Sequence, residues 1–147
     1  MQQAIEADAA LDAAYRRTHY EVPLPGGELL VLRVDVASPA LFAIHERCGV
    51  SCSAFLTAWN PRSVPQAAEQ NAMANQELEQ RLVALGFECW PGRGHDPSGD
   101  WPAEVSVFVP GLGLEAACLH GRHFGQNAIL HAGDDAVPRL VWLQAPR

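Results

Sequence analysis

The chain has 147 residues, of which 48% are hydrophobic and 18% are charged, so it is long enough for one domain with a sizeable core and too apolar to be disordered as a whole. Its formal net charge of −7 argues against binding to nucleic acid or to an anionic membrane surface, because both require a positive field. All ten Lys and Arg positions are occupied by arginine, a composition typical of GC-rich coding sequence. The alternative is that some of these guanidinium groups face an anion.

The N-terminal part is expected to form two helices and a hairpin. Residues 3–17 have roughly helical apolar spacing, and residues 19–36 contain two extended runs around a Pro-Gly-Gly turn. Ser38 precedes a proline and predicts the N-cap of a short helix that extends to about Arg47. The first residues include acids instead of the bases of a signal peptide, and no apolar run is long enough to span a membrane, so we expect a cytoplasmic protein.

From Ser53 onward the predicted elements alternate between strands and helices. Ser63 and Gln66 match a capping box, which predicts that the longest helix begins at about Val64. In chain order we expect a strand at 53–59, a helix at 64–85, a strand at 87–90, a polar loop at 91–102, a strand at 104–109, a helix at 114–124, and strands at 127–131 and 138–143.

This order of elements predicts a single α+β domain over residues 1–147. Residues 53–131 alternate as strand, helix, strand, strand, helix, strand, which is the ferredoxin-like βαββαβ arrangement. The N-terminal helix, the hairpin, the short helix and the C-terminal strand are then additions to that core. An open α/β mixed sheet is the alternative fold.

In the ferredoxin-like arrangement three polar connections meet at one end of the sheet. These are the loops 60–63, 91–102 and 122–126. Loops on a rigid sheet often carry binding residues, and the free N–H groups at the start of the long helix favour an anion. We therefore expect a cleft for a small polar or anionic ligand here, with the loop 91–102 as its lid. The arginines on the three connections are Arg62, Arg93 and Arg122.

Three polar residues stand out within the predicted elements. Asn71 and Asn75 lie one turn apart on the apolar stripe that should face the sheet, where an unpaired amide costs of order 1–3 kcal/mol. They either line a pocket or form a structural network with Thr57, Glu104 or Ser106. Glu104 is the candidate for acid–base catalysis, because partial burial at the start of its strand would raise its pKa. A solvated or ion-paired glutamate is the alternative.

The cysteines and histidines do not predict a metal site. Cys48 and Cys52 do not have the spacing of a zinc knuckle, and Cys118, His120 and His123 do not share one helix face. Motifs for a nucleophilic serine or for phosphate binding are also missing from the sequence. We expect cysteine thiols, no metal and no cofactor.

Several segments taken together resemble one known family. They are Ala54-Phe-Leu-Thr-Ala-Trp-Asn-Pro61, Asn71-x3-Asn75-x2-Leu78, Pro91-Gly-x-Gly94, Trp101-Pro102 followed by Glu104 and Ser106, and Phe124-Gly-Gln-Asn-Ala-Ile129. Over about residues 18–140 the chain resembles the bacterial domain of unknown function DUF3293. Val105 stands where the family pattern has proline. The resemblance implies no activity, but it emphasises Asn60, Asn71, Asn75, Glu104, Ser106 and Gln126.

Two functions are compatible with these observations. The first is binding of a small polar ligand in the cleft formed by the loops at 60–63, 91–102 and 122–126, with or without catalysis. The second is a non-catalytic protein-interaction module whose buried asparagine network is structural. For the first, Glu104 is the candidate catalytic residue, and the expected ligand-binding residues are Asn60, Asn71, Asn75, Ser106, Gln126, Arg62, Arg93 and Arg122.

Overall fold

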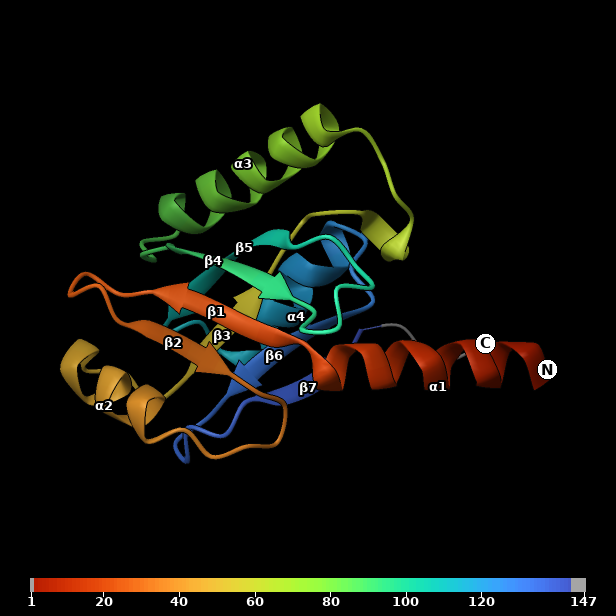
Figure 1. The fold of residues 1–147 in the computed structure, drawn as a ribbon. Helices are drawn as coiled ribbons and strands as arrows, with labels where there is room; N and C mark the ends of the chain where they lie inside the picture. The colour runs from red at the N-terminus through yellow and green to blue at the C-terminus, as the bar shows by residue number, and fades with distance from the viewer. Residues whose placement is uncertain (1, 144–147) are drawn as a thin grey trace.

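A computed structural model describes residues 2–143, with side chains from residue 9 onward. Its elements, shown in Figure 1, are α1 (Gln2–Arg17), β1 (His19–Pro23), β2 (Leu29–Leu32), α2 (Pro39–Cys48), β3 (Ser53–Leu56), the 3-10 turn η1 (Pro61–Ser63), α3 (Ala68–Ala84), β4 (Trp90–His95), β5 (Glu104–Pro110), α4 (Leu114–His123), β6 (Ala128–Ala132) and β7 (Arg139–Trp142). Within this part of the chain, no helix has the length and apolar character needed to cross a membrane.

The strands form one open antiparallel sheet in the order β2-β1-β4-β5-β3-β6-β7. In the middle of the sheet, Phe55 of β3 lies opposite Phe108 of β5 and Leu130 of β6. The expected α+β class is confirmed. The alternative of a mixed sheet is wrong, since every strand pair among residues 2–143 is antiparallel.

Helices cover both faces of the sheet. On one face, Leu78 and Leu82 of α3 and Ala117 of α4 pack with the apolar side chains of β3 and β5. On the other face, Leu41 and Ile44 of α2 pack against β1, β2 and β3. The C-terminal end of α1 lies at the sheet, and the rest of α1 projects away from it (Figure 1).

The boundaries of α2 agree with the sequence prediction. Ser38 Oγ accepts a hydrogen bond from the backbone N–H of Leu41 at 3.1 Å, as an N-cap side chain does. At the other end, Gly49 has a φ of 67°, and its N–H donates to the carbonyl oxygen of Glu46. Glycine tolerates this left-handed conformation, which explains why the helix ends there.

The start of α3 differs from the prediction. The helix begins at Ala68 instead of Val64, and neither Ser63 nor Gln66 caps it. Pro65 explains the difference, because a residue before proline avoids helical backbone, and Val64 is extended at φ −96° and ψ 119°. The capping-box prediction is therefore wrong.

Strand β4 occupies the first half of the predicted loop 91–102. It pairs with β1 on one side and with β5 on the other. A Cβ atom at Gly92 would lie 2.9 Å from both the Glu21 carbonyl oxygen and Phe55 Cε2. Glycine here permits close packing inside the sheet and does not mark a turn. The loop is confined to residues 96–103, so the predicted lid is shorter than expected.

His45 is a buried titratable group between α2 and β3. Its side chain is 3% exposed, Nε2 lies 2.8 Å from Ser53 Oγ, and Nδ1 has no hydrogen-bond partner within residues 2–143. Burial, reinforced by the neighbouring His131, lowers the pKa of His45 below 6.5, and Asp134 partly opposes this shift. The folded state therefore binds fewer protons than the unfolded state, and stability is lost as the pH falls below about 6.5.

We expect the free energy of unfolding, measured by urea denaturation, to decrease between about pH 7.5 and about pH 5.5. In His45→Gln this decrease should be smaller, because glutamine does not titrate. The same substitution at the exposed His123 is the control and should keep the wild-type pH dependence. Identical pH dependence in the wild type and in His45→Gln would contradict the prediction.

Candidate functional site

A cavity of about 380 Å³ lies between the C-terminal end of α1 and the sheet. Figure 1 shows that this end of α1, the loop 96–103 and η1 gather at one end of the sheet. The aromatic residues of its wall are Tyr15, Tyr20, Phe55, Trp59 and Trp101. The polar residues of its wall are Thr18, Thr57, Asn60, Ser63, Asp96, Glu104, Ser106 and Gln126.

Strand β5 supplies the carboxyl group of the cavity. Glu104 and Ser106 alternate along the strand with Val105, so they share the face that also carries the buried Phe108. Glu104 Oε2 accepts a hydrogen bond from Asn60 Nδ2 at 3.5 Å. Burial raises the pKa of Glu104 above 4.5, and the bond from Asn60 lowers it in part. The pKa shift has the direction expected from the sequence.

The segment that carries Asn60 has an uncommon backbone conformation. Asn60, Arg62 and Ser63 have φ values of 43°, 58° and 60°. This left-handed conformation costs roughly 1–2 kcal/mol for a residue with a side chain, although asparagine tolerates it better than most. Interactions elsewhere must therefore stabilise the segment.

Asn71 of α3 makes those interactions. Its Oδ1 accepts hydrogen bonds from the backbone N–H of Asn60 at 2.8 Å and from Gln66 Nε2 at 2.7 Å. Its Nδ2 donates to Asn60 Oδ1 at 2.8 Å, and the same oxygen accepts from the Gln66 N–H at 3.1 Å. Asn71 is 1% exposed and is not part of the cavity wall. Asn71 therefore holds Asn60 in place through hydrogen bonds and does not line the cavity itself.

Asn75, one turn further along α3, has a similar role. Its Oδ1 accepts from the Ala58 N–H at 2.8 Å, and its Nδ2 donates to the Val105 carbonyl oxygen at 3.0 Å. Thr57 Oγ1 donates to that same carbonyl oxygen at 2.7 Å and lies 3.3 Å from Asn75 Oδ1. The predicted partnership with Thr57 is confirmed. Asn75 fixes the start of β5 to the end of β3 and does not line the cavity.

The connection after α4 joins the same site. The backbone N–H of Arg62 donates to the Gly125 carbonyl oxygen at 2.8 Å. Gln126 is buried and lines the cavity, and its Nε2 donates to the Trp59 carbonyl oxygen at 3.2 Å. Because Asp96, Trp101 and Pro102 line the same cavity, the three polar connections meet at one end of the sheet, as predicted.

Asp96 begins the loop after β4. Its side chain is 2% exposed, and its Oδ1 accepts hydrogen bonds from the Ser98 N–H at 2.9 Å and from Ser98 Oγ at 2.7 Å. These bonds, with help from Arg17, hold the pKa of Asp96 below 3.8. Arg17 Nε lies 3.6 Å from Oδ1, a long ion pair. Oδ2 has no hydrogen-bond partner in the described part of the chain.

The α1 side of the cavity was not anticipated from the sequence. The cavity is lined on this side by Leu11, Ala14, Tyr15 and Thr18, which have the i, i+3, i+4, i+7 spacing of one helix face. This spacing is visible in the sequence and could have indicated that these residues share one side of the helix. Burial raises the pKa of the Tyr15 phenol, a shift that the Glu104 charge reinforces. The α1 helix therefore places a half-buried phenol in the same cavity wall as the carboxyl of β5.

The three arginines predicted to bind an anion are not part of the cavity wall. Arg93 Nε lies 2.7 Å from Glu21 Oε1, because β4 continues through residue 95 and makes the two residues a cross-strand pair. Arg122 Nε donates to the Leu143 carbonyl oxygen at 3.2 Å. Arg62 is exposed and borders a different hollow. The structure does not bring the three guanidinium groups together in the cavity.

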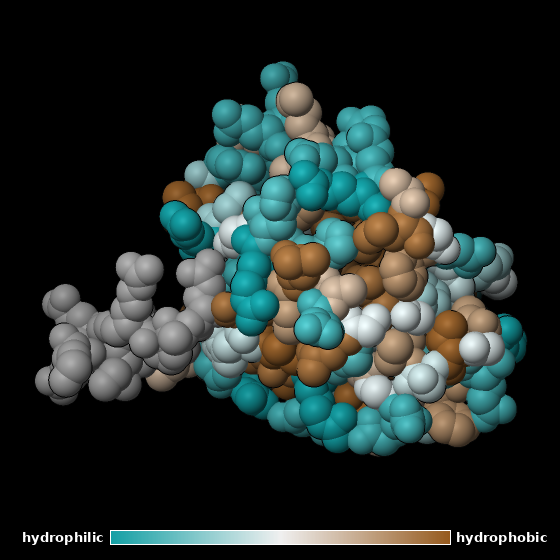
Figure 2. Space-filling view, turned by 180° about the vertical axis from the view of Figure 1, so that it is seen from behind, coloured by the Kyte–Doolittle hydropathy of each residue, from teal (hydrophilic) through white to brown (hydrophobic). Residues whose placement is uncertain are grey.

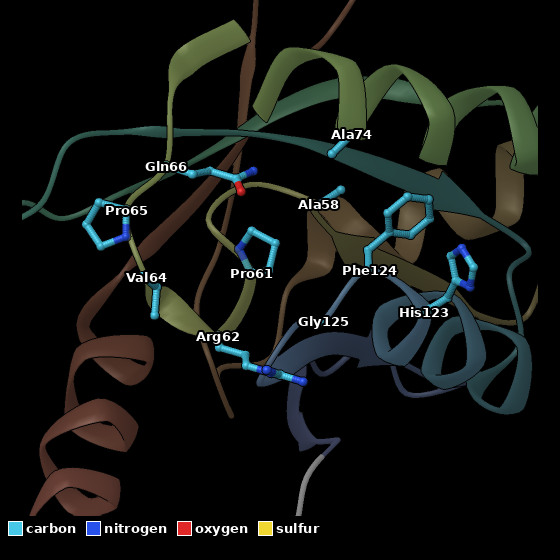
Figure 3. Close-up of a pocket in the computed structure, with 10 residues that line it drawn as sticks. All are labelled: Ala58, Pro61, Arg62, Val64, Pro65, Gln66, Ala74, His123, Phe124 and Gly125. Carbon is cyan, nitrogen blue, oxygen red and sulfur yellow. The ribbon is translucent and has the colours of Figure 1, made fainter. Parts of the chain in front are cut away.

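This second hollow, of about 580 Å³, is more open and lies between the segment 58–66, α3 and the end of α4. Figure 3 shows Ala74, Phe124 and Pro61 around it, with Arg62 below Pro61 in the view. In Figure 2, the face seen from behind carries apolar side chains near its centre and polar ones around them. The site with converging polar groups is the cavity beside α1.

Comparison with protein families gives one match, to the family described as "Protein of unknown function (DUF3293)", over residues 56–129. Comparison with curated proteins and with solved structures gives no match. The matched segment is half of the chain and includes the residues from Asn60 to Gln126, whereas Tyr15 and the rest of α1 lie outside it. The chain belongs to the DUF3293 family.

Proposed function

We propose that this protein binds a small polar ligand in the cavity beside α1. The observation that carries the proposal is a partly buried carboxyl, Glu104, held beside Asn60 in a cavity with aromatic walls. Ligand sites in proteins are commonly concave, about 300–1,000 Å³ in volume, largely apolar, and supplied with a few convergent polar groups. Carboxyl groups with a raised pKa that lie in a cleft are often found at functional sites.

The residues of the site have different roles in this proposal. Glu104, Asn60, Ser106 and Gln126 face the ligand and provide hydrogen bonds, and Glu104 is the group available for proton transfer. Asn71 and Asn75 position the ligand-binding residues and do not touch the ligand. The α1 helix and the loop 96–103 limit the access of water.

We also propose that the segment Ser53–Ala132 has the ferredoxin-like arrangement expected from the sequence. Two observations support this proposal: the order β4-β5-β3-β6 with antiparallel pairing, and the packing of α3 and α4 in one apolar cluster. The cavity then lies on the sheet face that α3 and α4 leave free.

A thermal-shift screen tests the proposed function. A panel of amines, nucleosides, amino acids, sugars and carboxylic acids should contain a compound that raises Tm by about 5–10 °C at about a hundred times its Kd. Ser106→Leu should abolish that shift, because the larger side chain fills part of the cavity. Ser51→Leu, the same change at an exposed position before β3, should leave it intact.

The two possible failures of this screen are informative. If no compound of any class raises Tm, the proposed function is wrong. The proposed function is also wrong if every effective compound raises the Tm of Ser106→Leu as much as it raises the Tm of the wild type, since binding would then occur outside the cavity.

A further inference from the structure

We infer that the ligand of this cavity is an organic cation, an ammonium group attached to an apolar or aromatic body; this inference rests on the proposed function. Among the described residues, the charged side chains of the cavity wall are Asp96 and Glu104, and both are acidic. The guanidinium groups of Arg62, Arg93 and Arg122 are directed to other partners or surfaces, as described above. The charge of the wall therefore favours a cation and disfavours an anion.

Asp96 gives this preference a specific anchor. Its side chain is almost fully buried, and its Oδ1 is occupied by two hydrogen bonds from Ser98, whereas Oδ2 has no partner in the described residues. Arg17 balances the charge only in part, since its contact is long and its side chain is 43% exposed. A buried carboxylate whose counter-charge is incomplete is costly, and a positive charge bound in the cavity that Asp96 lines would reduce that cost.

Glu104 offers a hydrogen-bond acceptor on the same wall. One of its carboxyl oxygens accepts a long hydrogen bond from Asn60 at 3.5 Å, and the other has no hydrogen bond within residues 2–143. An ammonium group has several N–H donors and no acceptor, so it complements acceptors that lack donors. A charge-assisted bond of this kind is stronger than a neutral one.

The aromatic residues of the wall select an organic cation. Tyr15, Tyr20, Trp59 and Trp101 present π-systems around the cavity, and aromatic cages are a common way of binding ammonium groups. In contrast, no group of three His, Cys, Asp or Glu side chains among the described residues is placed to hold a metal ion. The cavity volume also leaves space for an apolar body beside the charged group.

Isothermal titration calorimetry with matched probes tests this inference. The cations are phenethylamine and benzyltrimethylammonium, the neutral analogue is 2-phenylethanol, and the anion is phenylacetate. At least one cation should bind about tenfold or more tightly than 2-phenylethanol, and phenylacetate should bind most weakly. Phenethylamine and benzyltrimethylammonium distinguish a hydrogen-bonding ammonium from a purely cation–π contact.

Two variants connect the selectivity to the acidic residues. Asp96→Asn and Glu104→Gln should each weaken cation binding by about tenfold, and each should weaken the binding of 2-phenylethanol by a smaller factor, because the neutral alcohol loses no charge-assisted bond. Asparagine can still accept the Ser98 bonds, so the loop should keep its fold. Asp100→Asn removes an exposed charge from the same loop outside the cavity wall, and it should leave cation affinity within about twofold of the wild type.

The outcomes separate this inference from the proposed function. If phenylacetate or 2-phenylethanol binds as tightly as both cations, the preference for a cation is wrong while ligand binding remains supported. If the thermal-shift screen finds ligands in the cavity but neither cation binds, the inference is also wrong. If nothing binds in either experiment, the proposed function fails as well. Loss of cation affinity in Asp100→Asn equal to that in Asp96→Asn would refute the role of Asp96.

Discussion

Replacing Asn71 with leucine should lower the free energy of unfolding by about 2–4 kcal/mol. Leucine has a similar size, so the expected loss comes from hydrogen bonds and not from volume. The substitution leaves the backbone N–H of Asn60 and the Gln66 side chain without their acceptor, and it also removes the donor to Asn60 Oδ1. Each buried polar group left without a partner costs about 1–3 kcal/mol.

The hydrogen bonds of Asn71 also determine the backbone conformation of the segment that carries Asn60. Asn60, Arg62 and Ser63 have left-handed backbone, which the unfolded chain does not have to adopt. Asn71 is buried and directly opposite this segment, so its hydrogen bonds compensate for that conformational cost. Without them, the segment should relax and Asn60 should move away from Glu104.

Urea denaturation at neutral pH measures the effect. Gln76→Leu is the matched control, because Gln76 is an exposed residue on the same helix and its change should stay within about 0.5 kcal/mol of the wild type. A loss of less than about 1 kcal/mol in Asn71→Leu would show that the hydrogen bonds are not required for stability.

Gly92→Ala should lower the free energy of unfolding by about 1–3 kcal/mol, whereas Gly94→Ala should change it by less than about 1 kcal/mol. Both glycines lie on β4, two residues apart. A Cβ at Gly92 would be 2.9 Å from a backbone oxygen and from the Phe55 ring, so a buried strand pair would have to separate. A Cβ at Gly94 would meet Thr18 Cγ2 at 3.7 Å, an ordinary contact.

This pair of variants also tests whether residues 91–95 form a packed strand instead of the loop predicted from the sequence. In a mobile loop neither alanine would meet a close neighbour, and the two substitutions would have equal and small effects. Urea denaturation of both variants, compared with the wild type, distinguishes the two cases. Equal stabilities for Gly92→Ala and Gly94→Ala would contradict the packing of β4 against Phe55.

Local signals in the sequence correctly predicted many elements of the fold. Ser38 and Gly49 delimit α2 because a capping side chain and a left-handed glycine act within a few residues. The alternation of strands and helices also led to the correct conclusion that the polar connections meet at one end of the sheet. By contrast, Pro65 outweighed the Ser63 capping signal, because a steric restriction on backbone is stronger than one hydrogen bond.

The composition of the site was only partly predictable. Asn60, Glu104, Ser106 and Gln126 line the cavity, as the sequence suggested. Helical spacing correctly predicted that Asn71 and Asn75 face the sheet and need hydrogen-bond partners. It did not determine that the cavity lies on the other side of the sheet from them. Their role in positioning other residues became visible only with their partners in place.

The sequence by itself determined the class of the fold, the boundaries set by local caps, and the end of the sheet where polar residues gather, because these depend on spacing along the chain. The use of arginine at all ten Lys and Arg positions did not identify an anion site. Only the tertiary structure decided which guanidinium groups pair elsewhere, that glycine-rich β4 is a strand, and that α1 completes the cavity. Those features depend on residues distant in sequence that lie together, such as Arg93 paired with Glu21 and Tyr15 in the same cavity wall as Glu104, which no local pattern encodes.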